Sequence, residues 1–475
     1  MWRPTQETCV TTPIGEPFHD TEPQSGKPEY RTLLAIALPL SAAYLSEFAM
    51  FVTTKIVVGS LGHKEFAAVG LAGDLSFEVL VILMGLLSIV GVLVAQAEGA
   101  GRKYEAGQAA RQGFVVATLV GIAATVFIWN LDKVLALTDQ DPEILALGKP
   151  YLKGLSGFVL PVLWFAVLRN FVAAIAKTGA VMVITVAAVG LNYGLAVVLV
   201  HGSPWSAGLG VFGAGLATSL VSWVMFIALA VYVFRTRSLR GYGLFKGKLR
   251  LNLAICSDIV RLGLPVAGLV SLEAGLFVAV AVLSGVLGVY ALAAYEILMA
   301  WVGIPFVIAL GLAEATMVRV AYGIGRGDPV MARKSGFLGM GIGVVMLSAL
   351  IIVPISLPDV IVGLFIETND PGYAEIAALT RQLLIVVAIF QVFDGLQAIA
   401  SRSLRGVKDT IAPLWMAAFG YWVLGIGGGS YLAFQTDLAS RGLWWGLALG
   451  LVVTSLMLTW RFERLTRRLV VHDRA

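Results

Sequence analysis

Charge is scarce in this sequence of 475 residues. Only 13% of them are charged and 58% are hydrophobic, whereas a soluble globular domain carries roughly twice that share of charge. Long segments such as Ile342 to Leu357 and Leu443 to Trp460 contain no charge. Apolar runs of about 18 residues are typical of membrane-spanning helices. The composition therefore excludes a single soluble domain, which could not bury every such run on all sides.

Residues and motifs that commonly bind metals or catalyse reactions are also few. The two cysteines, Cys9 and Cys256, lie far apart and in no metal or redox spacing,. The four histidines fall in expected tails or loops, which argues against a histidine proton relay or a metal site within the membrane. The sequence has no Walker A motif and no constellation for covalent catalysis. We therefore expect a transporter rather than an enzyme, without a cofactor, a resident metal or direct ATP drive.

The first thirty residues lack the basic start and apolar core of a signal peptide. They are polar and rich in Pro, Thr and Glu, a composition that predicts a disordered tail over residues 1–30.

The apolar runs predict an all-α membrane protein with twelve spans, whose boundaries are good to a few residues. The spans are expected near 32–58, 66–95, 112–131, 147–172, 179–201, 207–234, 258–285, 291–317, 335–357, 378–401, 411–435 and 440–461.

The distribution of basic residues predicts the orientation in the membrane. With an even number of spans both termini lie on one side, and that side, with its expected loops, holds 27 of the 34 Lys and Arg residues. The opposite surface holds six, and Lys55 lies inside the first span. The positive-inside rule then places both termini in the cytoplasm of a cell-membrane protein. A positive cytoplasmic face also explains the net charge of +5, so no nucleic-acid partner is expected.

The chain contains an internal repeat. Leu38-Pro39 matches Leu264-Pro265, Glu47 matches Glu273, and Gly59 matches Gly285. Further on, Gly99-x-Gly101-Arg102 resembles Gly323-x-Gly325-Arg326, with two residues lost from the second copy. Each copy ends its fourth span with Leu-Arg, at Leu168-Arg169 and Leu404-Arg405.

The repeat divides the chain into a first half of six spans (31–234), a cytoplasmic linker (235–257), a second half of six spans (258–462) and a tail (463–475). Six spans per half give both halves the same orientation, so a pseudo-twofold axis along the membrane normal relates them. Two such lobes with a cleft between them favour an alternating-access transporter over a channel or an enzyme.

Several acids fall within the predicted spans, where a carboxylate costs about 2.5–3.5 kcal/mol on the translocon scale. They are Glu47, Asp74, Glu78, Glu273, Glu296, Glu314 and Asp394. Such groups normally face a cavity or a partner.

Glu273 and Asp394 are the strongest candidates for a functional site. Glu273 lies roughly 18 Å along its helix from Arg261, and Asp394 lies roughly 12 Å from Arg402, at 1.5 Å per residue. A carboxyl group kept from water can exchange a proton near neutral pH, and it can equally bind Na⁺ with the help of nearby carbonyl groups. We expect these two residues to bind the coupling cation.

The other acids have less specific interpretations. Asp74 and Glu78 stand four residues apart on one helix face and could line a cavity or only be solvated there. Glu314 is expected to pair with Arg319. Lys55 is the only cation expected near the middle of a span, and it would either extend outward or neutralise a neighbouring acid.

Several motifs, taken in their order along the chain, resemble those of the multidrug and toxic compound extrusion (MATE) family, in particular of its NorM-like branch. The resemblance covers nearly the whole chain after residue 31. It is carried by the segments Val94-Ala95-Gln96, Gly99 to Arg102, Gly210 to Thr218, Leu262 to Pro265, Phe393 to Gln397, Ser403 to Asp409 and Tyr421 to Gly425. It implies two six-span lobes, a central cleft, and antiport of organic, often cationic, compounds against H⁺ or Na⁺. In NorM-like members the coupling acids lie in spans 7 and 10, which matches Glu273 and Asp394.

The sequence also departs from the family pattern. The usual Asp of span 1 falls on Thr54, an aromatic hydroxyl of span 10 is replaced by Phe390, and Glu296 stands where the family has Gln. A cation site in the first lobe would therefore be either absent or rebuilt from Glu47, Asp74 and Glu78. Around the two coupling acids, we expect these residues at the cavity: Glu47, Asp74, Glu78, Glu296, Phe277, Phe390, Gln391, Gln397 and Tyr421.

The leading hypothesis is a secondary efflux transporter, a monomer surrounded by membrane lipid, that exports small organic compounds. Two alternatives remain open. One is a flippase or exporter of a lipid-linked or natural-product substrate in the same superfamily, and the other is a non-transporting membrane scaffold or enzyme.

Overall fold

The computed structural model describes residues 28–137, 142–203, 206–244, 251–363, 365–366 and 372–474. The predicted disordered tail lies almost wholly outside these residues. Twelve of the described helical segments are long and apolar enough to cross a membrane, which confirms the predicted number of spans.

The first half contains six spans, and two of them are interrupted. Span 2 breaks at Ser88, and a 3₁₀ turn at Ser156–Phe158 divides span 4. The helices are α1 (Glu29–Gly59), α2 (His63–Leu87), α3 (Ile89–Gly99), α4 (Lys103–Trp129), α5 (Leu131–Leu135), α6 (Pro142–Leu155), α7 (Val159–Ala174), α8 (Gly179–His201) and α9 (Gly210–Arg235). The short strands β1 (Gly202–Ser203) and β2 (Ser206–Ala207) form an antiparallel pair between α8 and α9.

The second half also contains six spans and follows a 3₁₀ segment, η2, at Arg237–Tyr242. Its helices are α10 (Leu253–Leu287), α11 (Val289–Gly325), α12 (Pro329–Leu350), α13 (Ile352–Ser356), α14 (Pro358–Gly363), α15 (Tyr373–Gly406), α16 (Ile411–Ala418), α17 (Gly429–Phe434) and α18 (Ser440–Arg474). Its second and fourth spans, α11 and α15, are continuous helices. Span 11 joins α16 and α17 through a π-helical stretch, η3, at Phe419–Gly428. Such wide turns within a helix are rare and are frequently found at functional sites.

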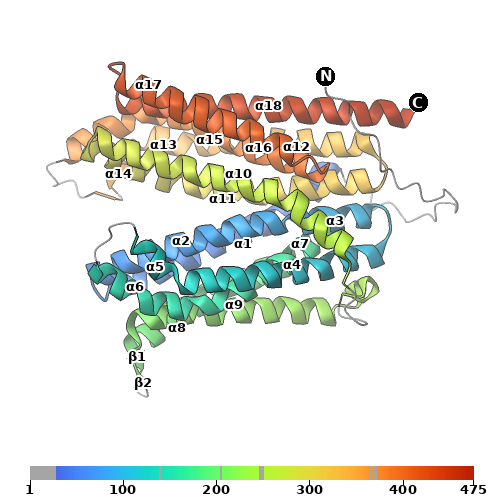
Figure 1. The fold of residues 1–475 in the computed structure, drawn as a ribbon. Coiled ribbons are helices and arrows are strands. Elements are labelled where there is room, and N and C mark those ends of the chain that lie inside the picture. Colours follow the sequence, from blue (N-terminus) through green and yellow to red (C-terminus); the bar gives the residue numbers. More distant parts are fainter. Residues whose placement is uncertain are drawn as a thin grey trace.

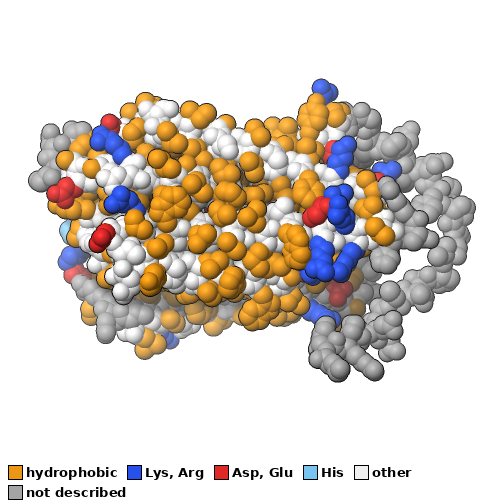
Figure 2. Space-filling view, turned by 90° about the horizontal axis from the view of Figure 1, so that it is seen from above, with side chains coloured by type: hydrophobic (Ala, Val, Ile, Leu, Met, Phe, Trp, Pro, Cys, Tyr) orange, Lys and Arg blue, Asp and Glu red, His pale blue; other side chains and the backbone are white. Residues whose placement is uncertain are grey.

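The two halves lie side by side, with α1–α9 in one layer and α10–α18 in the other (Figure 1). Seen from above, hydrophobic side chains cover the middle of the molecule and charged side chains gather toward its two ends (Figure 2). An apolar belt between two polar ends is the surface that a protein presents to a bilayer.

The structure corrects the alignment of the repeat. Gly101 and Gly327 both have left-handed backbone, with φ of 72° and 73°, and the next residue in each copy donates its N–H to the carbonyl five residues earlier, Arg102 to Ala97 and Asp328 to Gly323. Gly99 therefore corresponds to Gly325 and not to Gly323. The constant offset of 226 residues found at the start of the repeat continues here, and no residues are lost.

Several helices extend beyond the predicted spans. Arg319, Arg402 and Arg405 lie beyond the predicted spans but inside α11 and α15. Arg169, which was counted with the basic residues of the cytoplasmic loops, lies inside α7. A basic residue that follows an apolar run predicts the end of a helix. This prediction ends the helix too early when the basic side chain is buried. The tail after residue 462 is likewise helical, because α18 continues to Arg474.

The halves meet near the end where α1 begins and α18 finishes. Ser41 of α1 donates a hydrogen bond to the carbonyl of Ile308 in α11 (2.8 Å), and Gln96 of α3 donates to the carbonyl of Gly406 (3.1 Å). In the same region the backbones approach so closely that a Cβ added at Gly99 would clash with the carbonyl of Tyr322. This end of the molecule is therefore closed by direct packing between the halves.

Candidate functional site

The second half buries a cluster of polar groups around Asp394 of α15. Its side chain is 2% exposed, and in the part of the chain that the structure describes its Oδ1 atom has no hydrogen-bond partner. The amide of Gln397, the Nε2 atom of Gln391 and the hydroxyl of Tyr421 are also buried without partners among the described residues. Buried polar atoms are normally hydrogen-bonded, so this cluster is suited to receive a ligand.

Glu273 of α10 belongs to the same cluster. It is partly buried, and the charges of Glu273 and Asp394 act on each other and on Tyr421. Tyr421 lies in the π-helical stretch of span 11, where the wider turn shifts side chains relative to a regular helix. Three separate helical segments thus supply two carboxyl groups and a hydroxyl to one buried region.

Aromatic side chains pack beside this cluster. Phe390 contacts Phe277 edge-on, with ring centroids 6.3 Å apart, and contacts Trp444 with centroids 5.7 Å apart. Tyr295 packs on Trp444 and donates a hydrogen bond from its hydroxyl to the carbonyl of Phe277 (2.9 Å). These rings hold α10, α11, α15 and α18 together and keep water from one side of the carboxyl groups.

The first half encloses a cavity of about 110 Å³. Hydrophobic side chains form most of its lining, and the polar groups come from Glu47, Thr54, Lys55, Tyr151, Arg169, Asn192, Thr218 and Ser222. Glu47 belongs to this lining. Asp74, Glu78 and Glu296 do not belong to the lining, and Glu296 is exposed.

The inner polar contact of the cavity is an ion pair between Glu47 of α1 and Arg169 of α7. The Nη1 atom of Arg169 lies 2.6 Å from Oε1 of Glu47, and the guanidinium carbon lies 4.6 Å from the ring centroid of Tyr44. Arg169 is only 5% exposed. A second cation besides Lys55 therefore lines the cavity, although Arg169 had been counted with the cytoplasmic loops.

Near the outer end of α1, Lys55 forms an ion pair with Asp74 of α2 at 2.8 Å. The prediction that Lys55 neutralises a neighbouring acid is confirmed. The Nζ atom also lies 4.4 Å from the ring centroid of Phe51, while Asn192 donates a hydrogen bond to the hydroxyl of Thr54 (2.9 Å).

These pairings bear on the two alternatives for the first half, which are a cation site rebuilt from Glu47, Asp74 and Glu78 or no such site. Glu47 is engaged by Arg169, and Asp74 is engaged by Lys55. Among the described residues, no group of three His, Cys, Asp or Glu side chains could hold a metal ion. Glu47 and Asp74 are each paired with a base that the sequence had placed in a loop or left undecided.

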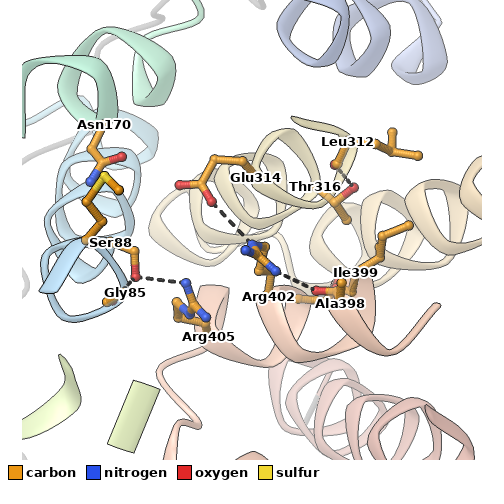
Figure 3. A network of polar contacts seen from close by, with 12 residues as sticks. Gly85, Ser88, Asn170, Leu312, Glu314, Thr316, Ala398, Ile399, Arg402 and Arg405 are labelled. Atoms are coloured by element: carbon orange, nitrogen blue, oxygen red, sulfur yellow. Dashed lines mark hydrogen bonds and ion pairs between the residues drawn. The ribbon is translucent and has the colours of Figure 1, made fainter. Parts of the chain in front are cut away.

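A buried charged network lies where the halves meet (Figure 3). Arg405 of α15 donates from Nη1 to the hydroxyl of Ser88 in the first half (2.8 Å), and Arg402 lies 3.5 Å from Glu314 of α11. Glu314 was predicted to pair with Arg319, but Arg319 instead binds Glu29 through two contacts of 2.7 and 2.8 Å. That prediction considered only neighbours along one helix, whereas the observed partners come from different helices.

Sequence reasoning thus missed the arginines of the interior and Trp444. The signal for the arginines was present in the repeated Leu-Arg that ends the fourth span of each half. It singled out both arginines, although they were counted with the basic residues of the loops. The structure does not make them equivalent, because the matching helix ends are at Ala176 and Lys408, which both have positive φ. No comparable signal distinguishes Trp444 from the other tryptophans of the apolar spans.

Among the described residues, twelve helices able to cross a membrane stand in two like halves, with a cavity in one half and buried carboxyl groups in the other. This is the architecture of a membrane transporter. The comparison with known proteins gives the family. The sequence profile of the MatE family matches residues 39–198 and 265–431. The chain belongs to the MatE family, and the resemblance found in the sequence is confirmed.

Individual relatives agree with this assignment. The chain is 36% identical to the multidrug resistance protein NorM of Burkholderia vietnamiensis, over 92% of this chain and 95% of the relative. It is 38% identical to the probable multidrug resistance protein NorM of Rhodopseudomonas palustris, over 91% of each chain.

Solved structures support the fold. The crystal structure of the eukaryotic MATE transporter AtDTX14 superposes with a TM-score of 0.82 at 22% identity, covering 94% of this chain and 99% of that one. An outward-facing multidrug resistance MATE family transporter of the MOP superfamily gives a TM-score of 0.84 at 19% identity, covering 93% and 96%. The predicted fold class is confirmed.

Proposed function

We propose that this chain is a secondary active exporter, which moves small organic compounds out of the cell in exchange for H⁺ or Na⁺. Its relatives are named for multidrug resistance, and the same activity suits the architecture described above. The observation that carries the proposal is Asp394, a carboxyl group only 2% exposed whose Oδ1 atom has no partner among the described residues.

In this proposal Glu273 and Asp394 bind the coupling cation. A proton on one carboxyl group would satisfy its unpaired oxygen, and Na⁺ would take the carboxyl oxygens together with hydroxyl and amide oxygens nearby. Tyr421 and Gln397 are placed to complete either arrangement, because their polar atoms are buried and unpartnered in the part of the chain that the structure describes. Efflux driven by a pH gradient would identify H⁺ as the coupling ion, and efflux driven by a Na⁺ gradient would identify Na⁺.

The cavity of the first half is proposed to bind the organic compound. Aromatic rings such as Phe51, Phe77 and Phe165 line it, and aromatic linings are common in ligand pockets. Its volume of about 110 Å³ is smaller than the roughly 300–1,000 Å³ of typical ligand pockets. A drug-sized compound would therefore place one end in the cavity and extend beyond it.

Transport would proceed by movement of residues 31–234 relative to residues 258–462. The hydrogen bonds and close backbone contacts between the halves cluster near the end of the molecule where α1 begins and α18 ends. The excess of Lys and Arg supports a cytoplasmic location for that end. The described conformation would then be closed toward the cytoplasm, and separation of the halves there would admit the compound.

The proposal can be tested with purified protein in liposomes that carry a pH gradient or a Na⁺ gradient. Wild-type protein should transport ethidium under at least one gradient, and Asp394→Asn and Glu273→Gln should abolish the gradient-driven component. Asp437→Asn and Glu375→Gln are matched controls, because both residues are exposed. Full coupled transport by Asp394→Asn and Glu273→Gln would refute the site, and no response of the wild type to either gradient would refute antiport.

A further inference from the structure

A groove runs between α12 and α18 on the surface of the second half. It has a volume of about 490 Å³, and its lining consists of Arg333, Phe337, Leu456, Thr459, Trp460 and Glu463. Leu456 and Trp460 are 55% and 56% exposed, so the groove opens to the surroundings of the protein. No residue of the proposed cation site or of the first-half cavity belongs to it.

The position of the groove along its two helices places it at a boundary of the membrane. A helix crosses the hydrocarbon with about 20 residues. Counted from Ser440, the first residue of α18, this length ends near Trp460. The span that begins with α12 ends at Ser356, and the same length counted back from there begins near Phe337. Tryptophan is enriched at this boundary. The charged part of the groove therefore lies about one turn outside the hydrocarbon.

Positive charge exceeds negative charge at this rim. Glu463 accepts two hydrogen bonds from Arg333, at 3.0 and 2.7 Å, and it also lies 3.2 Å from Arg467. Two guanidinium groups thus share one carboxylate. Arg464 lies over the ring of Trp460, with 5.3 Å between the guanidinium carbon and the ring centroid, and it forms no ion pair within the described residues. The three arginines therefore leave a surplus of two positive charges over this acid.

One side of α18 changes from apolar to basic along the groove. Exposed side chains at spacings of four, four and three residues lie on one side of a helix, and here they are Leu456, Trp460, Arg464 and Arg467. The first and last of them stand roughly 16 Å apart at 1.5 Å per residue. Arg461 is not part of this series, because it pairs with Asp409 at 2.8 Å. An apolar strip that leads to unneutralised arginines fits an acyl chain joined to a phosphate.

We propose that this groove binds an anionic phospholipid from the leaflet at the end of the molecule where α1 begins and α18 ends. One acyl chain lies along Phe337, Leu456 and Trp460, and Arg464 and Arg467 hold the phosphate. Arginine binds phosphate through charge-assisted and often paired hydrogen bonds, and basic clusters beside a membrane helix attract anionic lipids. Free phosphate would lack the apolar contacts, and a zwitterionic lipid would lack the net negative charge.

The test follows the melting temperature of the purified full-length protein in detergent while lipid is added. A ligand that binds only the folded protein stabilises it. Dioleoylphosphatidylglycerol should raise the melting temperature to a plateau, and the concentration at half of this rise reports its affinity. Dioleoylphosphatidylcholine should need a concentration at least roughly fivefold higher. Glycerol 3-phosphate, a head group without acyl chains, should leave the melting temperature unchanged over the same range.

Substitutions at the rim should shift the half-maximal concentration of phosphatidylglycerol in both directions. Arg464→Gln and Arg467→Gln should each raise it about fivefold, because a basic residue near a membrane surface contributes about this factor. Glu463→Gln removes the acid that competes with the phosphate and should lower it. Arg237→Gln is the matched control, because it removes the same charge from another exposed arginine, in η2, and it should leave the concentration unchanged.

An equal shift in Arg237→Gln and Arg464→Gln would overturn the inference, because it would show an effect of overall charge and not of this groove. Equal half-maximal concentrations for the two lipids would overturn it as well, and so would full stabilisation by glycerol 3-phosphate, which would indicate a site for free phosphate. If Arg464→Gln does not fold, Arg467→Gln still decides, since that side chain is 74% exposed. The measurement involves no transport, so its outcome is independent of the proposed cation exchange.

Discussion

Glu29, in the first turn of α1, binds Arg319 of α11 through both carboxylate oxygens, at 2.7 and 2.8 Å. Both side chains are largely buried, and Glu29 also accepts a hydrogen bond from Ser335 of α12 (2.8 Å). The start of the first half is thereby attached to the second half at the end where the two halves are packed together.

We expect Glu29→Gln to destabilise the protein. Removing one partner of a buried ion pair costs about 3–5 kcal/mol, because the remaining charge is left uncompensated. The apparent melting temperature of purified protein in detergent should therefore fall clearly. The control is Glu143→Gln, which breaks an exposed ion pair with Lys64 and should change stability by less than about 1 kcal/mol. Equal melting temperatures for both variants would contradict this assignment.

Replacement by Gln should change the stability of the protein differently at Glu47 and at Glu273, which match in the repeat. Glu47→Gln leaves Arg169 buried without its partner, and we expect a loss of about 3–5 kcal/mol in stability. Glu273→Gln removes no ion pair among the described residues, so thermal stability should stay near that of wild type. Thermal unfolding of the two purified variants tests this contrast. Equal destabilisation would show that Glu273 also has a structural partner.

The ion pair between Lys55 and Asp74 should influence which compounds enter the cavity. Asp74→Asn leaves an uncompensated ammonium group beside Phe51, and this should raise the KM for a cationic compound such as ethidium. Lys55→Gln should lower that KM. The effect should be a factor of a few, since partly exposed ion pairs contribute about 1 kcal/mol or less. Efflux of a neutral dye is the control, and a parallel change for both dyes would exclude a charge effect.

The orientation can be tested with single cysteines in a background where Cys9 and Cys256 are replaced by Ser. Leu357→Cys, between α13 and α14, should react with an impermeant maleimide on intact cells. Tyr104→Cys, near the start of α4, should react only after the membrane is permeabilised. Both side chains are well exposed. A reporter fused after His472 should read as cytoplasmic. The reverse labelling pattern would overturn the predicted topology.

The number of spans and the division into halves could be predicted from the sequence, because each depends on local features. Long apolar runs identify helices one at a time, and the matching Pro, Glu and Gly positions identify the repeat without any knowledge of packing. The two carboxyl groups of the second half, Glu273 and Asp394, could be selected in the same way, because an acid far from either end of an apolar run stands out in the sequence alone.

The partners of the charged residues could not be predicted, because they come from helices distant in the sequence. Glu47 and Arg169 are separated by 122 positions, and Arg319 and Glu29 by 290. A rule based on neighbours along one helix gave Glu314 the wrong partner. A rule that ends helices at basic residues placed Arg405 in a loop, although it is buried between the halves.

The close contacts of Gly99 and Gly325 have a consequence for how the halves separate. Gly99 packs against the carbonyl of Tyr322, and Gly325 packs against that of Gln96. Since 226 positions separate Gly99 from Gly325 and also Gln96 from Tyr322, each contact is the symmetry mate of the other, as in the interface of a twofold dimer. A rigid rotation that respects the axis cannot break one and preserve the other. Opening at this end is therefore a single concerted event, and a side chain added at either glycine should obstruct closure in the same way.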